Sequence, residues 1–281
     1  MSELPVLRPL EASDLTGAQA LSAVVAWPHR VEDWRFVHRL GVGVAAEHAG
    51  HLVGTAMGWT YGVHHAALGM VLVAPAMRGL GLGRKLTETM IDRLGERSIL
   101  LNATESGAPL YARLGFRADG LVRQHQGAAF SVELVPLSAG ERIRPIGRSD
   151  GAALAALDTA ASGLSRGPLL DALIETADGV VLDREGEVMG FALLRRFGRG
   201  HVIGPVVAPD ASSARALIAQ CVASSSGGFL RIDVPEDSGL SPWLDQLGLG
   251  EAGTATPMIR GAAPRTDSAI RRFALVSQAL G

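Results

Sequence analysis

Three alternating glycines stand between a predicted strand and a predicted helix, in the stretch V-A-P-A-M-R-G-L-G-L-G-R-K that runs from Val73 to Lys85. Glycine allows the backbone to bend without a clash at Cβ, and it allows backbone N–H groups to come close to an anion. The first turn of the helix adds unpaired N–H groups and the positive end of its dipole. The stretch therefore predicts a site for a phosphate or a pyrophosphate.

Two well-known phosphate-binding patterns do not fit this stretch. In a P-loop the lysine follows a glycine and precedes Ser or Thr, whereas Lys85 stands between Arg84 and Leu86. In the dinucleotide-binding pattern the third glycine comes three residues after the second, whereas Gly83 follows Gly81 at the second position. The remaining alternatives are a phosphate site of another kind and a tight turn without a ligand.

The residues around these glycines resemble motif A of the GNAT superfamily of acyl-CoA-dependent N-acetyltransferases. Arg78-x-x-Gly81-x-Gly83 follows a strand that ends in Val73-x-Pro75, and an amphipathic helix comes after it. A second stretch, from Thr104 to Phe116, resembles another signature of that superfamily, in which a tyrosine (here Tyr111) stands four residues before Gly-Phe. Because the two motifs lie in the expected order and separation, the N-terminal half is identified as a member.

The resemblance implies direct transfer of acetyl from acetyl-CoA to the amine of a small-molecule acceptor, in a ternary complex and without a covalent enzyme intermediate. Tyr111 would protonate the leaving thiolate, and the N–H of Val73 would polarise the thioester carbonyl. Loop amides would hold the pyrophosphate, and the splayed strand before the loop would pair with the pantetheine arm. No metal is implied. The cofactor-binding residues implied are Val71, Leu72, Val73, Arg78, Gly79, Leu80, Gly81, Leu82, Gly83, Arg84 and Thr104.

The sequence leaves several candidates for the general base. Ala67 stands where histone-type members of the superfamily carry a glutamate. His125 is the preferred candidate, because the closing strands of this fold line the acceptor groove and three neighbouring polar residues are unusual in a sheet. The other candidates are His64, His65, Glu105 and a water molecule.

A charged and aromatic stretch, from Trp27 to Trp34, lies where the resemblance implies a cover over the acceptor. In that interpretation His29, Glu32 and Trp34 contact the substrate. The alternative is a solvated helix start, in which Glu32 and Asp33 complement the helix dipole.

The pattern of apolar residues predicts a mixed α/β fold, with helices on both faces of a mixed sheet. Leu82, Leu86, Met90 and Leu94 recur at the spacing of one helix face. The predicted strands cover residues 4–8, 42–47, 52–61, 67–73 and 98–103, the other helices cover 14–25, 31–40 and 107–114, and a closing hairpin joins 116–124 to 128–135.

The second half of the sequence repeats the first in the same order. The predicted result is two tandem GNAT-like domains, over residues 1–138 and 142–263, followed by a docking helix over 264–281. The matching segments are Leu7-Arg8-Pro9-Leu10 with Ile143-Arg144-Pro145-Ile146, Val73-Ala74-Pro75 with Val207-Ala208-Pro209, and Leu114-Gly115-Phe116 with Leu247-Gly248-Leu249.

The second copy lacks both signatures of the first. Asp210 stands where a pyrophosphate would lie, and its negative charge would repel that ligand. Leu244 replaces Tyr111. We therefore expect a degenerate domain without CoA, which packs against the first domain and walls the acceptor site. The polar candidates for that wall are Ser165, Arg166, Arg195, Arg196 and Asp233.

The composition of the 281 residues limits the classes of function. A net charge of −2 gives no overall attraction to DNA or RNA, so no nucleic-acid partner is expected. Cys221 is the only cysteine, which fits a buried helix residue and a reducing cytoplasm. No apolar run is long enough to span a membrane, and the excess of Ala and Gly indicates a bacterial genome rich in GC.

Other functions remain open at this level. The alanine at position 67 also allows a non-catalytic protein that binds or senses acyl-CoA. A further alternative is a GNAT enzyme that uses another acyl group or a protein amine. The sequence specifies neither the acceptor amine nor the oligomeric state.

Overall fold

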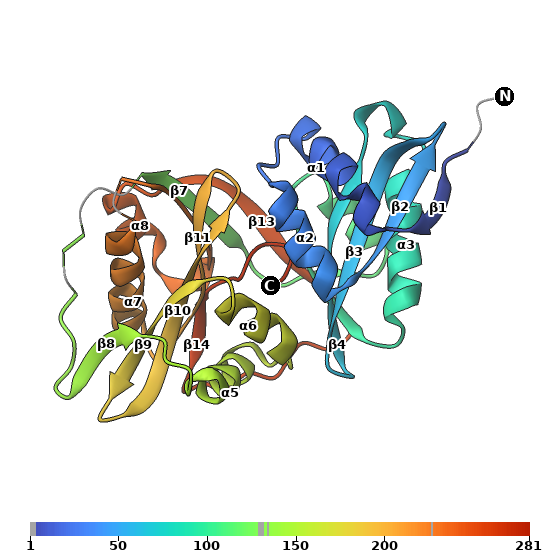
Figure 1. The fold of residues 1–281 in the computed structure, drawn as a ribbon. Coiled ribbons are helices and arrows are strands. Elements are labelled where there is room, and N and C mark those ends of the chain that lie inside the picture. Colours follow the sequence, from blue (N-terminus) through green and yellow to red (C-terminus); the bar gives the residue numbers. More distant parts are fainter. Residues whose placement is uncertain (1–3, 129–131, 134, 226) are drawn as a thin grey trace.

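The computed structural model describes residues 4–128, 132–133, 135–225 and 227–281. Within this part of the chain the two halves have closely similar element orders, and helices cover both faces of the strands (Figure 1). The mixed α/β fold and the tandem arrangement predicted from the sequence are confirmed.

The helices and strands of each half follow one another as the repeat predicts. In the N-terminal half they are β1 (Val6–Pro9), α1 (Leu15–Val24), α2 (Val31–Leu40), β2 (Val42–His48), β3 (His51–Tyr61), β4 (His65–Val73), α3 (Leu82–Leu94), β5 (Ser98–Ala103), α4 (Ala108–Arg113), β6 (Arg117–Ala118) and β7 (Val122–Ala128). In the C-terminal half they are β8 (Glu141–Pro145), α5 (Gly151–Ser162), α6 (Gly167–Ile174), β9 (Asp178–Arg184), β10 (Glu187–Phe197), β11 (Gly200–Ala208), α7 (Ala211–Ser224), β12 (Phe229–Pro235), α8 (Ser241–Gln246), β13 (Gly250–Arg260) and β14 (Arg271–Ala274).

One continuous sheet joins the halves, because they exchange their closing strands. Among the described residues the strand order is β1-β2-β3-β4-β5-β13-β7-β12-β11-β10-β9-β8. Strand β13 comes from the C-terminal half but pairs with β5 of the N-terminal half. Strand β7 comes from the N-terminal half and pairs with β12. Figure 1 shows β13 crossing from one half into the other.

The strand exchange corrects the closing hairpin that the sequence predicts for residues 116–135. Strand β7 pairs with β12 and β13, and the short β6 pairs with β13. The second arm of the predicted hairpin falls partly on residues 129–131 and 134, outside the described residues, and no strand is formed at residues 132, 133 and 135. A boundary near residue 138 thus separates the repeats along the chain but does not separate the sheet.

The core between the halves is apolar and shared. Helices α1 and α2 on one side and α5 and α6 on the other contribute to a single cluster of buried side chains. Trp34, Trp59 and Leu154 are fully buried within it. Two further clusters lie under α3 and under α7, one in each half. Removing apolar surface from water is favourable by about 25 cal/mol for each Å². The shared core therefore favours a fixed arrangement of the two halves.

The segment after β13 is a strand and a turn, not the docking helix predicted for residues 264–281. Strand β14 pairs antiparallel with β11. The apolar spacing of Ile270, Phe273, Ala274 and Val276 fits both structures, and long-range pairing decides between them. The chain then passes between the halves, where its last residues lie (Figure 1).

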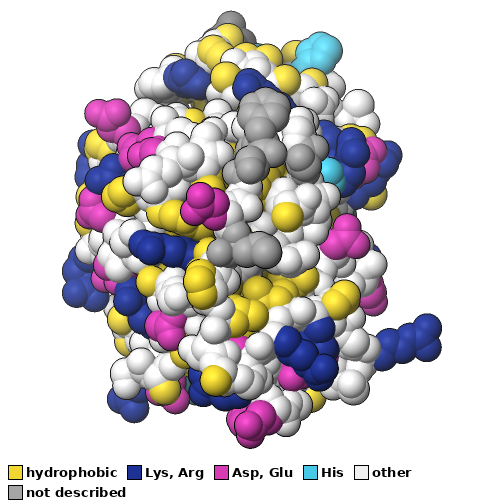
Figure 2. Space-filling model, turned by 90° about the vertical axis from the view of Figure 1, so that its left-hand side faces the viewer, with side chains coloured by type: hydrophobic (Ala, Val, Ile, Leu, Met, Phe, Trp, Pro, Cys, Tyr) yellow, Lys and Arg dark blue, Asp and Glu magenta, His cyan; other side chains and the backbone are white. Residues whose placement is uncertain are grey.

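None of the helices in the described residues is long and apolar enough to cross a membrane. Figure 2 shows the face of the C-terminal half, on which basic and acidic side chains are interspersed.

Candidate functional site

The glycine-rich loop takes a conformation that only glycine adopts without strain. After a short 3-10 turn at Pro75–Met77, Gly79 and Gly81 have φ of 78° and 76°, in the left-handed region. Gly81 is the N-cap of α3. A Cβ atom at either glycine would meet nothing within 4 Å, so open space lies over the loop.

The loop leaves a row of backbone amides without acceptors. Arg78 N–H donates to the Pro75 carbonyl at 3.2 Å, and Lys85 N–H donates to the Gly81 carbonyl at 3.1 Å. Between them, no backbone acceptor in the described residues receives the amides of Gly79 to Arg84. These amides, at the positive end of a helix of thirteen residues, can bind an anion.

Strands β4 and β5 part from each other beside this loop. They pair in parallel only from His65↔Ser98 to Ala67↔Leu100, and their later residues have no ladder between them. The amide of Ala74 donates to Val53 of β3 at 2.8 Å. Because successive strand amides point to opposite sides, the amides of Val71 and Val73 face the open side.

A bulge on β4 marks the point where the strands diverge. The register between β3 and β4 shifts between Thr55 and Met57, and Met70 has a φ of 51°. The buried hydroxyl of Thr55 donates to the Met70 carbonyl at 2.8 Å and satisfies that polar group. Neither Thr55 nor Met70 belongs to a local motif, so the sequence gives no signal for their role.

Tyr111 lies on α4 with its ring packed edge-on against Phe116 at 5.9 Å. The side chain is 9% exposed, and burial raises the pKa of its phenol to about 12. At neutral pH the hydroxyl therefore carries its proton. Gly107 makes room for the ring, because a Cβ there would lie 3.2 Å from it.

The loop, β4 and α4 meet at Gly83. A Cβ atom at this glycine would contact Val73 of β4 at 3.6 Å and Leu110 of α4 at 3.7 Å. Thr104, just after β5, accepts the Gly107 amide at 3.2 Å and so serves the turn that starts α4. The structure thus brings the predicted anion loop, the open edge of β4 and the helix of Tyr111 together.

His125 is not placed to act as the base, which corrects the preferred candidate. Its ring has no exposed surface. Nδ1 lies 2.8 Å from the Leu249 carbonyl and Nε2 lies 3.0 Å from the Ser241 hydroxyl. Because strand exchange carries β7 into the C-terminal half, this histidine packs under α8 instead of lining a groove.

The other base candidates are also distant from the diverging strands or lie on the surface. His64 and His65 are at the opposite end of β4, and His65 is about 17 Å along the strand from Met70. Glu105 is exposed in the turn before α4. Ala67 is buried on β4. Apart from His65, β4 carries no titratable side chain, and Glu105 and water remain as candidates.

The residues predicted to contact the substrate separate into three environments. Trp34 is fully buried and donates to the Ser22 hydroxyl at 3.3 Å, so it belongs to the core. Glu32 is exposed near Arg35 at the start of α2, as the alternative interpretation expects. His29 lies between the halves, 5.3 Å from the ring of Phe197, and burial lowers its pKa to about 4.

The corresponding region of the C-terminal half is closed. The Asp210 carboxylate accepts a hydrogen bond from the Ser213 amide at 2.8 Å and caps α7. The amide that could bind an anion at this helix start therefore already has an acceptor. Strands β11 and β12 pair only over three residues and then part, as β4 and β5 do. Strand β14 fills that gap, and Leu275 N–H donates to the Asp233 carbonyl of β12 at 2.9 Å.

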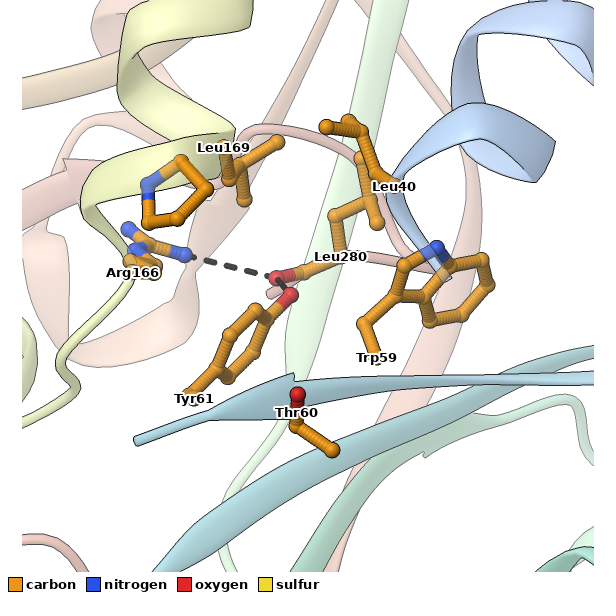
Figure 3. Close-up of a pocket in the computed structure, with 8 residues that line it drawn as sticks. Leu40, Trp59, Thr60, Tyr61, Arg166, Leu169 and Leu280 are labelled. Carbon is orange, nitrogen blue, oxygen red and sulfur yellow. Dashed lines mark hydrogen bonds between the residues drawn. The ribbon is translucent and has the colours of Figure 1, made fainter. Parts of the chain in front are cut away.

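The segment after β14 crosses to the N-terminal half. Asn102 of β5 donates to the Gln278 carbonyl at 2.9 Å, and Ala279 packs against Gly69 of β4. Figure 3 shows Tyr61 and Arg166 converging on the Leu280 carbonyl, with Tyr61 at 2.7 Å and Arg166 at 3.4 Å.

Of the polar residues predicted to wall the acceptor site, three are buried and two are exposed. Arg166 is buried and paired with Asp158 at 2.8 Å. Asp233 is buried and paired with Arg231, and Arg195 is buried beside Phe197. Ser165 is exposed next to Gly62, and Arg196 is exposed. A cavity of about 820 Å³ also lies between the halves and reaches Ala67 and Asn102.

Cys221 is a buried residue of α7, as predicted, and burial raises the pKa of its thiol to about 12. No group of three or more His, Cys, Asp or Glu side chains able to hold a metal ion occurs in the described part of the chain.

Comparison with known proteins agrees with this geometry. A model of the acetyltransferase (GNAT) family matches residues 12–116, and a model of the acetyltransferase (GNAT) domain matches residues 154–273. The chain is 30% identical over 220 residues to the uncharacterized N-acetyltransferase YitH of Bacillus subtilis (strain 168), covering 76% of each. The chain therefore belongs to the GNAT acetyltransferases and is an acyltransferase with two GNAT domains.

Two solved structures share the fold over nearly the whole chain. A candidate acetyltransferase of Pyrococcus horikoshii superposes with a TM-score of 0.79 at 18% identity, covering 100% of this chain and 97% of that one. A tandem GNAT protein from the clavulanic acid biosynthesis pathway superposes with a TM-score of 0.68 at 14% identity, covering 93% and 99%.

Proposed function

We propose that this protein is an acetyl-CoA-dependent N-acetyltransferase that acetylates the amine of a small-molecule acceptor, with its cofactor site in the N-terminal half alone. The observation that carries the proposal is the row of acceptor-free amides from Gly79 to Arg84 beside the open edge of β4. The C-terminal half offers neither feature, because Asp210 and β14 occupy the corresponding places.

The residues present fit acetyl-CoA. The loop amides would hold the pyrophosphate, and Val71 and Val73 would pair with the pantetheine arm. Acetyl-CoA supplies an activated thioester. The N–H of Val73 would donate to the carbonyl oxygen, where negative charge develops, and the phenol of Tyr111 would donate its proton to the leaving sulfur.

The acceptor would reach the thioester from the side that faces the C-terminal half. The last segment of the chain touches β4 at Gly69 and β5 at Asn102, just where the strands part. Since no base stands at Ala67, we expect the amine to lose its proton through water or to bind as the neutral form. The C-terminal half would then act as the wall that selects the acceptor.

The Tyr111→Phe variant tests this proposal. Loss of a general acid lowers a rate by about 10² to 10⁴. We expect kcat to fall by at least about 10²-fold, while acetyl-CoA binds as to the wild type and the midpoint of thermal unfolding stays within a few degrees. An unchanged kcat would contradict the role of Tyr111. A wild type that binds acetyl-CoA but acetylates no amine in a broad panel would favour an acyl-CoA-binding protein without catalysis.

A further inference from the structure

Arg195 is a buried cation without a counter-ion. It projects from β10 between the halves and is 5% exposed. The two aspartates nearby are already engaged: Asp33 with Arg30 at 2.8 Å and Asp233 with Arg231 at 2.9 Å. Among the described residues Arg195 forms no ion pair. The cluster of three arginines and two aspartates therefore has one positive charge that no carboxylate balances.

The donors of Arg195 are equally unsatisfied. Its Nε is buried and has no hydrogen-bond partner, and its Nη2 reaches only the Val276 carbonyl at 3.5 Å. The guanidinium lies over the rings of Phe36 at 5.3 Å and Phe197 at 4.9 Å. Contacts with aromatic faces recover part of the cost of burial, but a buried ion without a partner remains unfavourable.

A second polar atom without a partner lies around the same aromatic ring. The Nδ1 of His29 is buried and makes no hydrogen bond, and its ring packs 5.3 Å from Phe197. Arg231 lies over Phe197 as well, at 5.5 Å. Buried polar groups are nearly always paired, so two unpaired ones around one ring indicate a missing polar partner, and the unpaired charge of Arg195 favours an anion.

This group is connected to the place where β4 and β5 part. Asp233, the partner of Arg231, accepts from Gln278 Nε2 at 3.3 Å. The carbonyl of the same Gln278 accepts from Asn102 of β5 at 2.9 Å. Gln278 therefore links the residues around Phe197 to the part of β5 next to the diverging strands.

We infer that Arg195 binds a carboxylate of the acceptor, so that the substrate class is a small amine that carries a carboxylate, such as an amino acid. The Nε and Nη2 donors of one guanidinium edge match the two oxygens of a planar carboxylate. The inference rests on the proposed function and adds the chemistry of the substrate to it. The degenerate half then contributes the residue that selects the acceptor.

The test compares matched acceptors on Arg195→Met and Arg199→Met. The acceptors are α-amino acids, their amides and the corresponding amines without the carboxyl group, and thiol release from acetyl-CoA gives kcat/KM. We expect the wild type to prefer the carboxylates. In Arg195→Met, kcat/KM for the carboxylates should fall about 10- to 100-fold, mainly through the KM of the acceptor, whereas the amides and simple amines should change little. Arg199→Met, with the same change at an exposed arginine in the turn that follows β10, should keep the preference.

Folding does not obscure the result, because replacing an unpaired buried charge by an apolar side chain of similar length is often neutral or stabilising. The midpoint of thermal unfolding and the affinity for acetyl-CoA check that each variant is intact. If the wild type prefers amines without a carboxyl group, the inference is wrong. It is also wrong if Arg195→Met keeps the wild-type preference for carboxylates. Neither result would contradict the proposed function. A wild type that acetylates no amine while binding acetyl-CoA would overturn the proposed function and the inference with it.

Discussion

The loop glycines allow a direct test of the cofactor site through Gly81→Ala. Gly81 has a φ of 76°, and a Cβ atom there would meet nothing within 4 Å, so the substitution adds strain without a clash. A left-handed alanine costs about 1–2 kcal/mol. The loop can relieve this strain by rotating its peptide groups, which turns the amides of the row away from the phosphates. The loss of one charge-assisted hydrogen bond, about 1.5–3 kcal/mol, corresponds to roughly 10- to 100-fold in affinity.

Gly95→Ala is the matched control. Gly95 ends the same helix with a φ of 69° and a ψ of −143°, another backbone region that favours glycine, and a Cβ atom there also meets nothing within 4 Å. We expect both variants to lose stability by about 1–3 kcal/mol in urea unfolding, but only Gly81→Ala to lose acetyl-CoA affinity in calorimetric titration. If Gly81→Ala loses stability and yet binds acetyl-CoA as tightly as Gly95→Ala, the loop amides do not hold the pyrophosphate.

Three further predictions follow from buried groups. His125→Ala should lower the free energy of unfolding by about 3 kcal/mol, because it removes two hydrogen bonds and buried volume. The kcat of the folded variant should change less than tenfold. A 100-fold loss of kcat in a stably folded variant would restore His125 as the base. Because burial raises the pKa of Tyr111 to about 12, its phenol keeps its proton below that pH. The pH profile of kcat should therefore show no fall between pH 7 and 10. A fall of kcat with a midpoint near pH 10 would contradict this role of Tyr111. The thiol of Cys221, with its pKa raised to about 12, should react with a thiol reagent at pH 8 only when the protein unfolds, and immediate reaction of the native protein would show that it is accessible.

The exchange of closing strands ties the two halves into one structural unit. Strand β13 supplies the neighbour of β5, and β7 supplies the neighbour of β12, so neither half has a complete sheet alone. Strand β14 also occupies the gap between β11 and β12, and Gly204 allows this because any Cβ there would clash with the Leu275 carbonyl. The chain itself thus fills the place that an extended ligand would take in that half.

The expectations that concern contiguous residues agree with the structure most closely. The glycine loop runs from β4 into α3, Tyr111 follows β5 on a short helix, and the repeat gives two halves with similar element orders. A strand, a loop of glycines and a helix start are adjacent along the chain, so local conformational preferences largely determine their geometry. The loss of the glycines and of the tyrosine from the second copy is visible in the sequence for the same reason.

The tertiary structure alone decided the features that depend on partners far along the chain. An alternating apolar pattern predicts a strand but not the strand that pairs with it. The sequence therefore predicted a hairpin for β7, a position in the acceptor groove for His125 and a helix for the last residues. Strand exchange buried His125, and pairing with β11 made β14 a strand. The environment of Arg195 arises in the same way, because α2, β10 and the final segment come together only in the folded chain. Burial without a counter-ion is a property of that packing, and no local pattern of residues encodes it.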